Sequence, residues 1–252
     1  MEPMICPPPP VRKIELVATL SEAERRALDA ALVRHAEFAA HEDIIRENDR
    51  PDHSTVILDG MTCRYKTLSS GERQIMNFGI AGDWVDLHSY FLRSMDHSIS
   101  AMSHCRVAQV PHATVRSLIE DHARLGQILW RETLVESAIF REWVVNLGAR
   151  DAHTRLAHLL CELHTRMVAV GLADGSALVL PLTQNDLADA TGISSVHVNR
   201  VFQQLKAEGL ATYGRGCVTV HDWEGLAKAG LFDPTYLHLD GRKARAMATA
   251  AE

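Results

Sequence analysis

The residues best suited to chemistry lie on one predicted helix in the C-terminal third of the chain. Apolar side chains recur there at helical spacing, at Val198, Val201, Phe202 and Leu205. This spacing leaves four polar side chains on the opposite face: Ser195, His197, Asn199 and Arg200. Such hydroxyl, imidazole, amide and guanidinium groups make hydrogen bonds to base edges and phosphates of DNA. The pattern therefore predicts a helix that reads the major groove.

A shorter helix must hold this reading helix in place. Thr183 is a suitable N-cap for a helix over residues 184–190, and Asp186 lies in its first turn, where the helix dipole favours an anion. Gly192 supplies the left-handed residue of the turn, and Ser194 can cap the second helix. Two short strands, 210–213 and 217–220, follow around a glycine turn. An ordinary packed helix pair is the alternative, but this order favours a winged helix-turn-helix.

The first half of the chain has a different pattern. A helix capped by Ser21 is followed, up to about Val110, by short apolar segments that alternate with turns. This alternation predicts an antiparallel β-barrel or sandwich, which could enclose a ligand.

A long helix is then predicted from near His112 to Leu147, with one break. It carries two apolar stripes where packing on the barrel needs only one. We therefore expect a homodimer, with an interface at Leu125, Ile128, Val135 and Ile139. Glu132 and Glu142 interrupt this first stripe. The second stripe contains Trp130, Leu134, Ala138 and Val145.

Composition limits the remaining functions. A chain of 252 residues with 46% hydrophobic content can bury two modest cores. Membrane-spanning and export segments are not apparent, so we expect a cytoplasmic protein that does not bind membranes. The net charge of −6 argues only weakly against DNA binding, but residues 150–220 contain six basic and six acidic residues, so we expect weak non-specific DNA binding.

Catalytic and metal chemistry have little support in the sequence. A Ser-His-Asp set, a phosphate loop and paired carboxylates are not evident, so we expect no enzyme activity. The five cysteines include no CxxC pair, which disfavours an iron-sulfur cluster. His153, His158, Cys161 and His164 have a spacing open to zinc, but we interpret them as an ordinary helix face. We predict no metal site and no cofactor.

The order of barrel, long helix and winged helix-turn-helix resembles the Crp-Fnr family of bacterial transcription regulators. The segments that most strongly resemble the family are residues 182–189, 195–200 and 82–87, together with Asp96-His97-Ser98. The resemblance implies an α+β protein with a cyclic-nucleotide-binding-like β-barrel (a double-stranded β-helix). The expected domains are a disordered Pro-rich lead at 1–13, the barrel at 14–111, a dimerisation helix at 112–148, the winged helix-turn-helix at 149–225 and a C-terminal extension at 226–252.

The resemblance also implies a homodimer on a palindromic site in double-stranded DNA, with RNA polymerase as a partner. It places Arg200 against a guanine, Thr183, Ser194 and His197 at phosphates, and Arg215 at the wing tip. Two positions depart from the family pattern. Gln184 replaces a basic side chain of some members, and Val196 replaces a glutamate that accepts a bond from a base.

The expected effector pocket departs further. By resemblance it contains Asp86, Asp96, His97, Ser98, Phe140 and Arg141. Asp86 could accept ribose hydroxyls, but Asp96 beside His97 suits a cyclic phosphate poorly, because an arginine fork is missing. We therefore expect an effector other than cyclic AMP, and its identity is open. The alternative function is a barrel-based ligand or metal sensor that acts mainly through protein partners.

Overall fold

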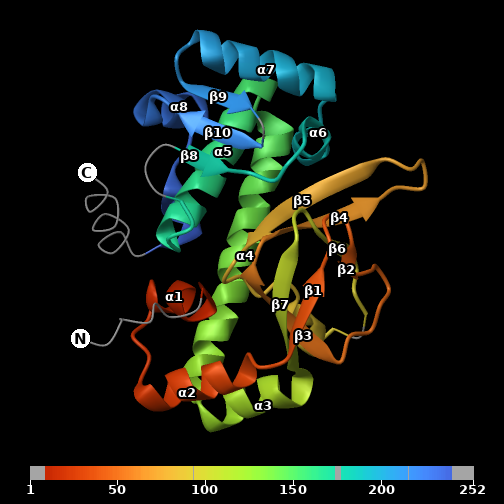
Figure 1. Ribbon diagram of the computed structural model, residues 1–252, viewed down its shortest axis with the longest axis vertical. Coiled ribbons are helices and arrows are strands. Elements are labelled where there is room, and N and C mark those ends of the chain that lie inside the picture. The colour runs from red at the N-terminus through yellow and green to blue at the C-terminus, as the bar shows by residue number, and fades with distance from the viewer. Residues whose placement is uncertain (1–8, 93, 174–176, 215, 240–252) are drawn as a thin grey trace. The chain divides into compact units, whose positions relative to one another are not determined.

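A computed structural model describes residues 9–92, 94–173, 177–214 and 216–239 of the protein (Figure 1). Its contacts divide the chain into two units. The first unit contains residues 1–62 and 79–134, and the second contains residues 63–78 and 135–252. The helix-rich and strand-rich segments expected from the sequence are both present, so the mixed α and β class is confirmed.

The first unit begins with two helices, α1 (Pro9–Glu15) and α2 (Glu22–Ala31). Ser21 and Glu24 form a capping box that starts α2, as the sequence predicts for Ser21. Residues 9–13 lie in α1, in place of the disordered lead that we expected there. Val11 is fully buried in the core, and this apolar burial orders the segment. Residues 1–8 lie outside the described residues.

Antiparallel strands form the body of the first unit. One sheet has the order β1 (His35–Phe38), β7 (Cys105–Pro111) and β3 (His53–Asp59). In its register His35 lies opposite Ala108, and Ile57 opposite Val107. A second antiparallel pair joins β2 (Asp43–Ile45) to β6 (Ser98–Ala101). A 3₁₀ turn, η1 (Leu87–Tyr90), lies between these strands in the sequence.

Two helices complete this unit and lead out of it. His122 separates α3 (His112–Asp121) from α4 (Ala123–Ala149), which corresponds to the single break expected in the long helix. Leu125 and Ile128 of α4 are buried in the same cluster as Val56 of β3 and Leu118 of α3. The start of α4 is therefore part of the core of the first unit.

A buried ion cluster also ties α1 to α4. The Lys13 ammonium lies 2.9 Å from a carboxylate oxygen of Asp83 and contacts the carboxylate of Glu132. Burial by itself lowers the pKa of Lys13, but the two carboxylates outweigh it and the net shift is upward. Glu132, which interrupts the first apolar stripe in the sequence, thus lies in the core as the partner of a lysine.

The second unit contains most of the hairpin of β4 (Met61–Thr67) and β5 (Arg73–Ile80) and the helix α5 (Ala152–Ala169). After α5 come β8 (Ala177–Val179), α6 (Gln184–Thr191) and α7 (Ser195–Ala207). They are followed by β9 (Ala211–Gly214), β10 (Cys217–Val220), α8 (Trp223–Ala229) and the 3₁₀ turn η2 (Pro234–Leu237). The three short strands form one antiparallel sheet of order β8-β10-β9.

A buried polar network holds the C-terminal half of α4 to α5 and η2. Glu162 is fully buried and accepts hydrogen bonds from Trp143 Nε1 at 3.1 Å, Tyr236 Oη at 2.8 Å and Arg166 Nη1 at 3.2 Å. Burial raises the pKa of Glu162, although these donors oppose the shift. A buried carboxylate needs such donors, because an unpaired one would be expensive to desolvate.

The stripe that we assigned to the dimer interface is mostly buried within the single chain. Leu125 is 1% exposed, and Ile128 and Ile139 are 6% exposed, while Val135 is half-buried. This assignment needs correction, because helix α4 turns its first stripe into the chain's own core. The exposed apolar side chains of α4 belong mainly to the other stripe: Trp130, Leu134, Val144 and Val145.

Candidate nucleic-acid interface and sensor site

Helices α6 and α7 are joined as the sequence predicts. The Thr183 hydroxyl accepts a hydrogen bond from the Asp186 backbone N–H, and the Asp186 carboxylate accepts one in return from the Thr183 backbone N–H. This capping box fixes the start of α6. Gly192 ends α6 with a φ of 64°, the left-handed conformation that favours glycine. Ser194 then caps α7 by accepting from the His197 backbone N–H at 3.2 Å.

The two faces of α7 separate as expected. Val198, Val201 and Leu205 are fully buried, and Phe202 is nearly so. On the opposite face Asn199 and Arg200 are exposed, while Ser195 and His197 are half-exposed. Among the cap residues, Thr183 and Ser194 are exposed and Gln184 is half-exposed. The predicted DNA-binding side chains that the structure describes are therefore exposed or half-exposed.

A β-hairpin packs beside α7. Strands β9 and β10 pair with Cys217 opposite Gly214, and β8 extends the sheet on the other side of β10. The ring of Tyr213 stacks on Phe202 of α7 at 4.6 Å between centroids, and its hydroxyl donates to the Leu182 carbonyl at 2.7 Å. These contacts fix the wing against the helix pair. Arg215, predicted at the wing tip, lies outside the described residues.

Arg73 on the β4–β5 hairpin reaches the acidic side of α6. It lies 2.6 Å from a carboxylate oxygen of Asp186 and 2.7 Å from one of Asp189. Gln74 Nε2 also donates to the Asp189 carbonyl at 2.7 Å. Arg73 thereby neutralises carboxylates on the helix that precedes the reading helix. No sequence pattern indicates this contact, because Arg73 and Asp186 are far apart along the chain.

Arg155 joins the end of α4 to the end of α6. Its guanidinium donates to the carbonyls of Asn146 at 3.0 Å and of Leu147 and Arg150 at 2.9 Å. It also donates to the carbonyl of Thr191 in the last turn of α6. The last carbonyls of a helix lack partners within the helix, so this one side chain satisfies two helix ends at once. No local pattern in the sequence marks Arg155 for this role.

Of the six residues expected in an effector pocket, four belong to the first unit and two, Phe140 and Arg141, to the second. Asp86 is fully buried, and its carboxylate accepts from the Thr55 backbone N–H and from the Thr55 hydroxyl at 3.1 Å. It therefore anchors β3, and the expectation that it accepts ribose hydroxyls needs correction. Phe140 and Arg141 belong to the second unit, where Phe140 lies 5.9 Å below the Arg64 guanidinium and Arg141 is exposed.

The remaining pocket residues stay together before and at the start of β6. Asp96 Oδ1 lies 2.7 Å from His97 Nδ1, and the Ser98 hydroxyl accepts from the Glu47 backbone N–H at 3.0 Å. Partial burial raises the pKa of the Asp96 carboxyl, but hydrogen bonding to His97 outweighs this effect and the net shift is downward. The structure therefore places a carboxylate directly beside the imidazole of His97.

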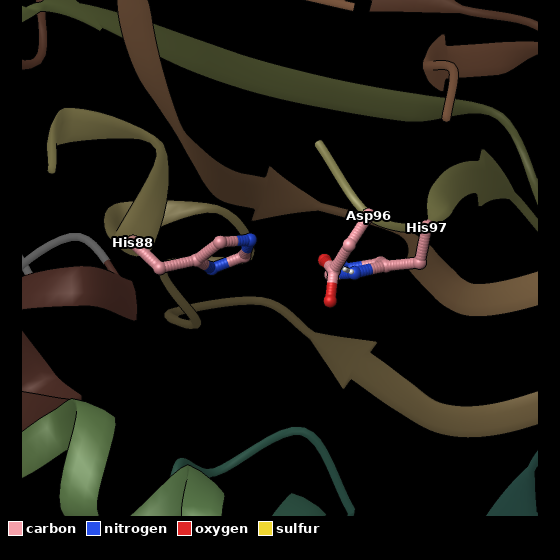
Figure 2. A group of neighbouring side chains, drawn as sticks. All are labelled: His88, Asp96 and His97. Carbon is pink, nitrogen blue, oxygen red and sulfur yellow. Dashed lines mark hydrogen bonds and ion pairs between the residues drawn. The ribbon is translucent and has the colours of Figure 1, made fainter. Parts of the chain in front are cut away.

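His88 of η1 joins this pair (Figure 2). One donor atom from each of His88, Asp96 and His97 lies within 4.8 Å of the others. The sequence did not reveal this group, because its members come from two segments that only the fold brings together. The three histidines whose spacing with Cys161 is open to zinc have other contacts. His153 lies 2.9 Å from Glu208, His158 is buried against the Gly230 carbonyl and Tyr236, and His164 lies against Trp223.

An apolar groove of about 660 Å³ lies in the first unit, between η1 and the helices α3 and α4. Its lining includes Leu87, His88 and Tyr90 of η1, together with Ile119 of α3 and Leu129 of α4. His88 is therefore shared between the groove and the group with Asp96 and His97.

Comparison with known proteins identifies both parts of the chain. Residues 35–122 match the family model of the cyclic nucleotide-binding domain, and residues 154–229 match that of the Crp-like helix-turn-helix domain. The chain is 27% identical over 214 residues to the nitrogen fixation regulation protein FixK of Bradyrhizobium diazoefficiens, covering 84% of this chain and 88% of that relative. It is 24% identical over 221 residues to the transcriptional activator protein FnrL of Cereibacter sphaeroides, covering 86% and 88%.

The solved structures agree with this fold. The structure of FixK2 from Bradyrhizobium japonicum superposes with a TM-score of 0.71 at 24% identity, covering 77% of this chain and 96% of that one. A CRP-family transcriptional regulator from Thermus thermophilus, TTHB099, gives 0.64 at 17% identity, covering 78% and 97%. An N-terminal cyclic-nucleotide-binding-type β domain, a long helix and a C-terminal helix-turn-helix define a class of DNA-binding transcription regulators that are not enzymes. The chain belongs to the Crp-Fnr family of this class.

The family assignment confirms the fold class and the regulatory function expected from the sequence, and the comparisons give no support to a sensor that acts through protein partners. In the part of the chain that the structure describes, no helix has the length and hydropathy needed to cross a bilayer.

Proposed function

We propose that the protein acts as a homodimer on a palindromic DNA site, with α7 of each protomer in the major groove. The observation that carries this proposal is the polar face of α7, where Asn199 and Arg200 are exposed behind a buried apolar face. The first helix and the capped turn fix the orientation of α7, so these side chains can be presented in one geometry. A two-fold dimer then needs half-sites about 10 base pairs apart, centre to centre.

Within this proposal the exposed residues divide into two roles. Arg200 reads a guanine through a bidentate contact, and Ser195 and Asn199 contact neighbouring base edges. Thr183, Gln184, Ser194 and His197 lie near the phosphates, where they set the register on the duplex without reading sequence. Arg215 is proposed as a further phosphate contact from the wing tip.

Dimerisation is proposed through the exposed apolar side chains of α4. Trp130 is 68% exposed, Leu134 is 54% exposed and Val144 is 71% exposed. Large apolar side chains exposed along one helix are typical of a surface that a partner covers. A second copy of the chain is the proposed partner, and this interface replaces the buried stripe at Leu125.

The effector is proposed to be other than cyclic AMP. Asp96 stands beside His97 where a cyclic phosphate would need a cation, and Asp86 is committed to Thr55. We further propose, from family membership, that the regulator works in the cytoplasm and contacts RNA polymerase. We propose four functional divisions of the chain: the barrel at 14–111, the dimerisation helix at 112–148, the DNA-binding domain at 149–225 and an extension at 226–252.

Selection from a random DNA library tests the DNA proposal. The wild-type protein should enrich a palindrome, and Arg200→Ala should cost about 1–3 kcal/mol per half-site and relax the preference at one base pair. Lys206→Ala is the matched control, because Lys206 is an exposed cation near the other end of the same helix. The proposal is wrong if no palindrome is enriched, or if Arg200→Ala keeps the affinity and the base preference of the control.

A further inference from the structure

We propose that His88, Asp96 and His97 bind a divalent transition-metal ion of the Zn²⁺ type in the first unit. Figure 2 shows the two imidazole rings directed toward each other from two segments of the chain, with the Asp96 carboxylate beside His97. The family resemblance and the matched domains assign no metal to these residues. The proposal concerns this unit alone and does not depend on the proposed DNA contacts.

The donor set is one that such ions prefer. Two imidazoles and one carboxylate are the protein ligands of many catalytic zinc sites, and the same combination also binds ferrous iron. The three donor atoms lie within 4.8 Å of one another, and the two rings lie 5.3 Å apart with an interplanar angle of 32°. Ligand bonds of about 2.0–2.2 Å require donor atoms nearer than this, so the side chains must close on the ion by roughly 1 Å. The Asp96 side chain is 77% exposed and can rotate to do so.

The neighbours of the group favour coordination. One carboxylate oxygen of Asp96 lies 2.7 Å from His97 Nδ1, which leaves its second oxygen to face an ion. Coordination through His97 Nδ1 would replace the proton that this nitrogen shares with Asp96, so the ion would take the place of the present hydrogen bond. His97 itself is only 7% exposed, so its ring is held by the surrounding fold, while the exposed Asp96 provides access from solvent.

A salt bridge between Asp96 and His97 is the simpler interpretation of the contact. In that interpretation the ring of His88 only packs against the ring of His97, 5.3 Å away between centroids. The position of His88 within 4.8 Å of both others, on the separate turn η1, is what distinguishes a three-donor site from an ordinary pair. The two interpretations differ in whether the intact protein takes up one ion per chain.

Binding would connect two parts of the first unit. Asp96 and His97 precede β6, and His88 lies on η1 beside Leu87 and Tyr90, which line the apolar groove. An ion held by all three residues would fix η1 relative to β6 and so restrict one wall of the groove. The site thus gives the first unit a binding chemistry that differs from recognition of a cyclic nucleotide.

Cobalt titration of the full-length, tag-free protein tests the proposal. Co²⁺ substitutes for Zn²⁺ and its visible absorption reports coordination by the protein, while equilibrium dialysis with Zn²⁺ gives the stoichiometry. We expect one saturable site per chain with a dissociation constant in the micromolar range or below. His88→Ala and Asp96→Asn should each weaken binding at least tenfold, and these side chains are accessible enough for the variants to fold.

His104→Ala is the matched control, because it removes an imidazole that is 64% exposed elsewhere in the same unit. This variant should bind Co²⁺ like the wild type, and circular dichroism should show the same helix content for all variants. The proposal is overturned if the wild type shows no saturable site below about 100 µM metal. It is equally overturned if His88→Ala and Asp96→Asn bind the ion as the control does.

Discussion

Replacement of Arg155 by alanine is the most informative test of how the DNA-binding helices are held. The guanidinium donates four hydrogen bonds, to the carbonyls of Asn146, Leu147, Arg150 and Thr191. Each bond contributes about 0.5–1 kcal/mol here, because the side chain is half-exposed and water can partly replace it. The four together give an expected loss of about 2–4 kcal/mol in the free energy of unfolding.

Urea unfolding followed by tryptophan fluorescence measures this loss. With a slope of about 2 kcal/mol per molar urea, the midpoint of the second unit's transition should fall by roughly 1–2 M. Arg155→Lys should lie between alanine and wild type, because one ammonium cannot span four carbonyls. Arg141→Ala is the matched control, an exposed arginine on α4, and should change the stability by less than about 0.5 kcal/mol.

DNA binding provides a second measurement on the same variants. Thr191 lies at the end of α6, so loss of Arg155 should weaken binding to every sequence while the preferred palindrome stays the same. An Arg155→Ala protein as stable as Arg141→Ala would refute the reasoning, because water would then replace the four hydrogen bonds without a loss of stability.

Four further outcomes are expected. Leu134→Glu should convert the dimer to monomers, as measured by sedimentation at micromolar concentration. Leu68→Glu, which changes an exposed side chain outside α4, should leave the dimer intact. A monomeric wild-type protein would contradict the proposed interface. Calorimetry with cyclic AMP should show no saturable binding in the low micromolar range, and clear saturation would show that the pocket has been misread. Burial, with a smaller effect of Arg150, lowers the pKa of His158 to about 4 from an ordinary 6.5, so the unfolded chain takes up a proton first as the pH falls. This histidine should therefore leave the free energy of unfolding unaffected above pH 6.5 and decrease it by about 2–3 kcal/mol as the pH falls toward 4. His158→Gln should flatten this dependence of stability on pH, and an unchanged dependence would contradict the role of His158. Finally, Val196 is 67% exposed on α7 and suits contact with a thymine methyl group. Val196→Glu should therefore shift the selected half-site toward a base with an amino group, and an unchanged half-site would exclude a role of position 196 in base recognition.

The sequence alone was sufficient for the helix-turn-helix. Its signals are local: the cap at Thr183, the left-handed Gly192, the cap at Ser194 and the apolar spacing of α7 all act within about thirty residues. Local hydrogen bonds and glycine conformations depend little on the rest of the chain, so these elements could be predicted with their boundaries nearly right. The antiparallel strands of the first unit were predicted for the same reason, from alternation and turns.

Tertiary structure decided the features that depend on which distant segments meet. The sequence shows two apolar stripes on α4, but only packing shows that Leu125 enters the core and Leu134 stays exposed. By residue type Asp86 suits a ligand or a strand equally well, and its position against Thr55 settles the choice. Three contacts could not be predicted from any sequence pattern: Arg73 with α6, Arg155 with four carbonyls, and His88 with His97. Each contact joins two segments, and their separation in the sequence carries no information about their distance in space.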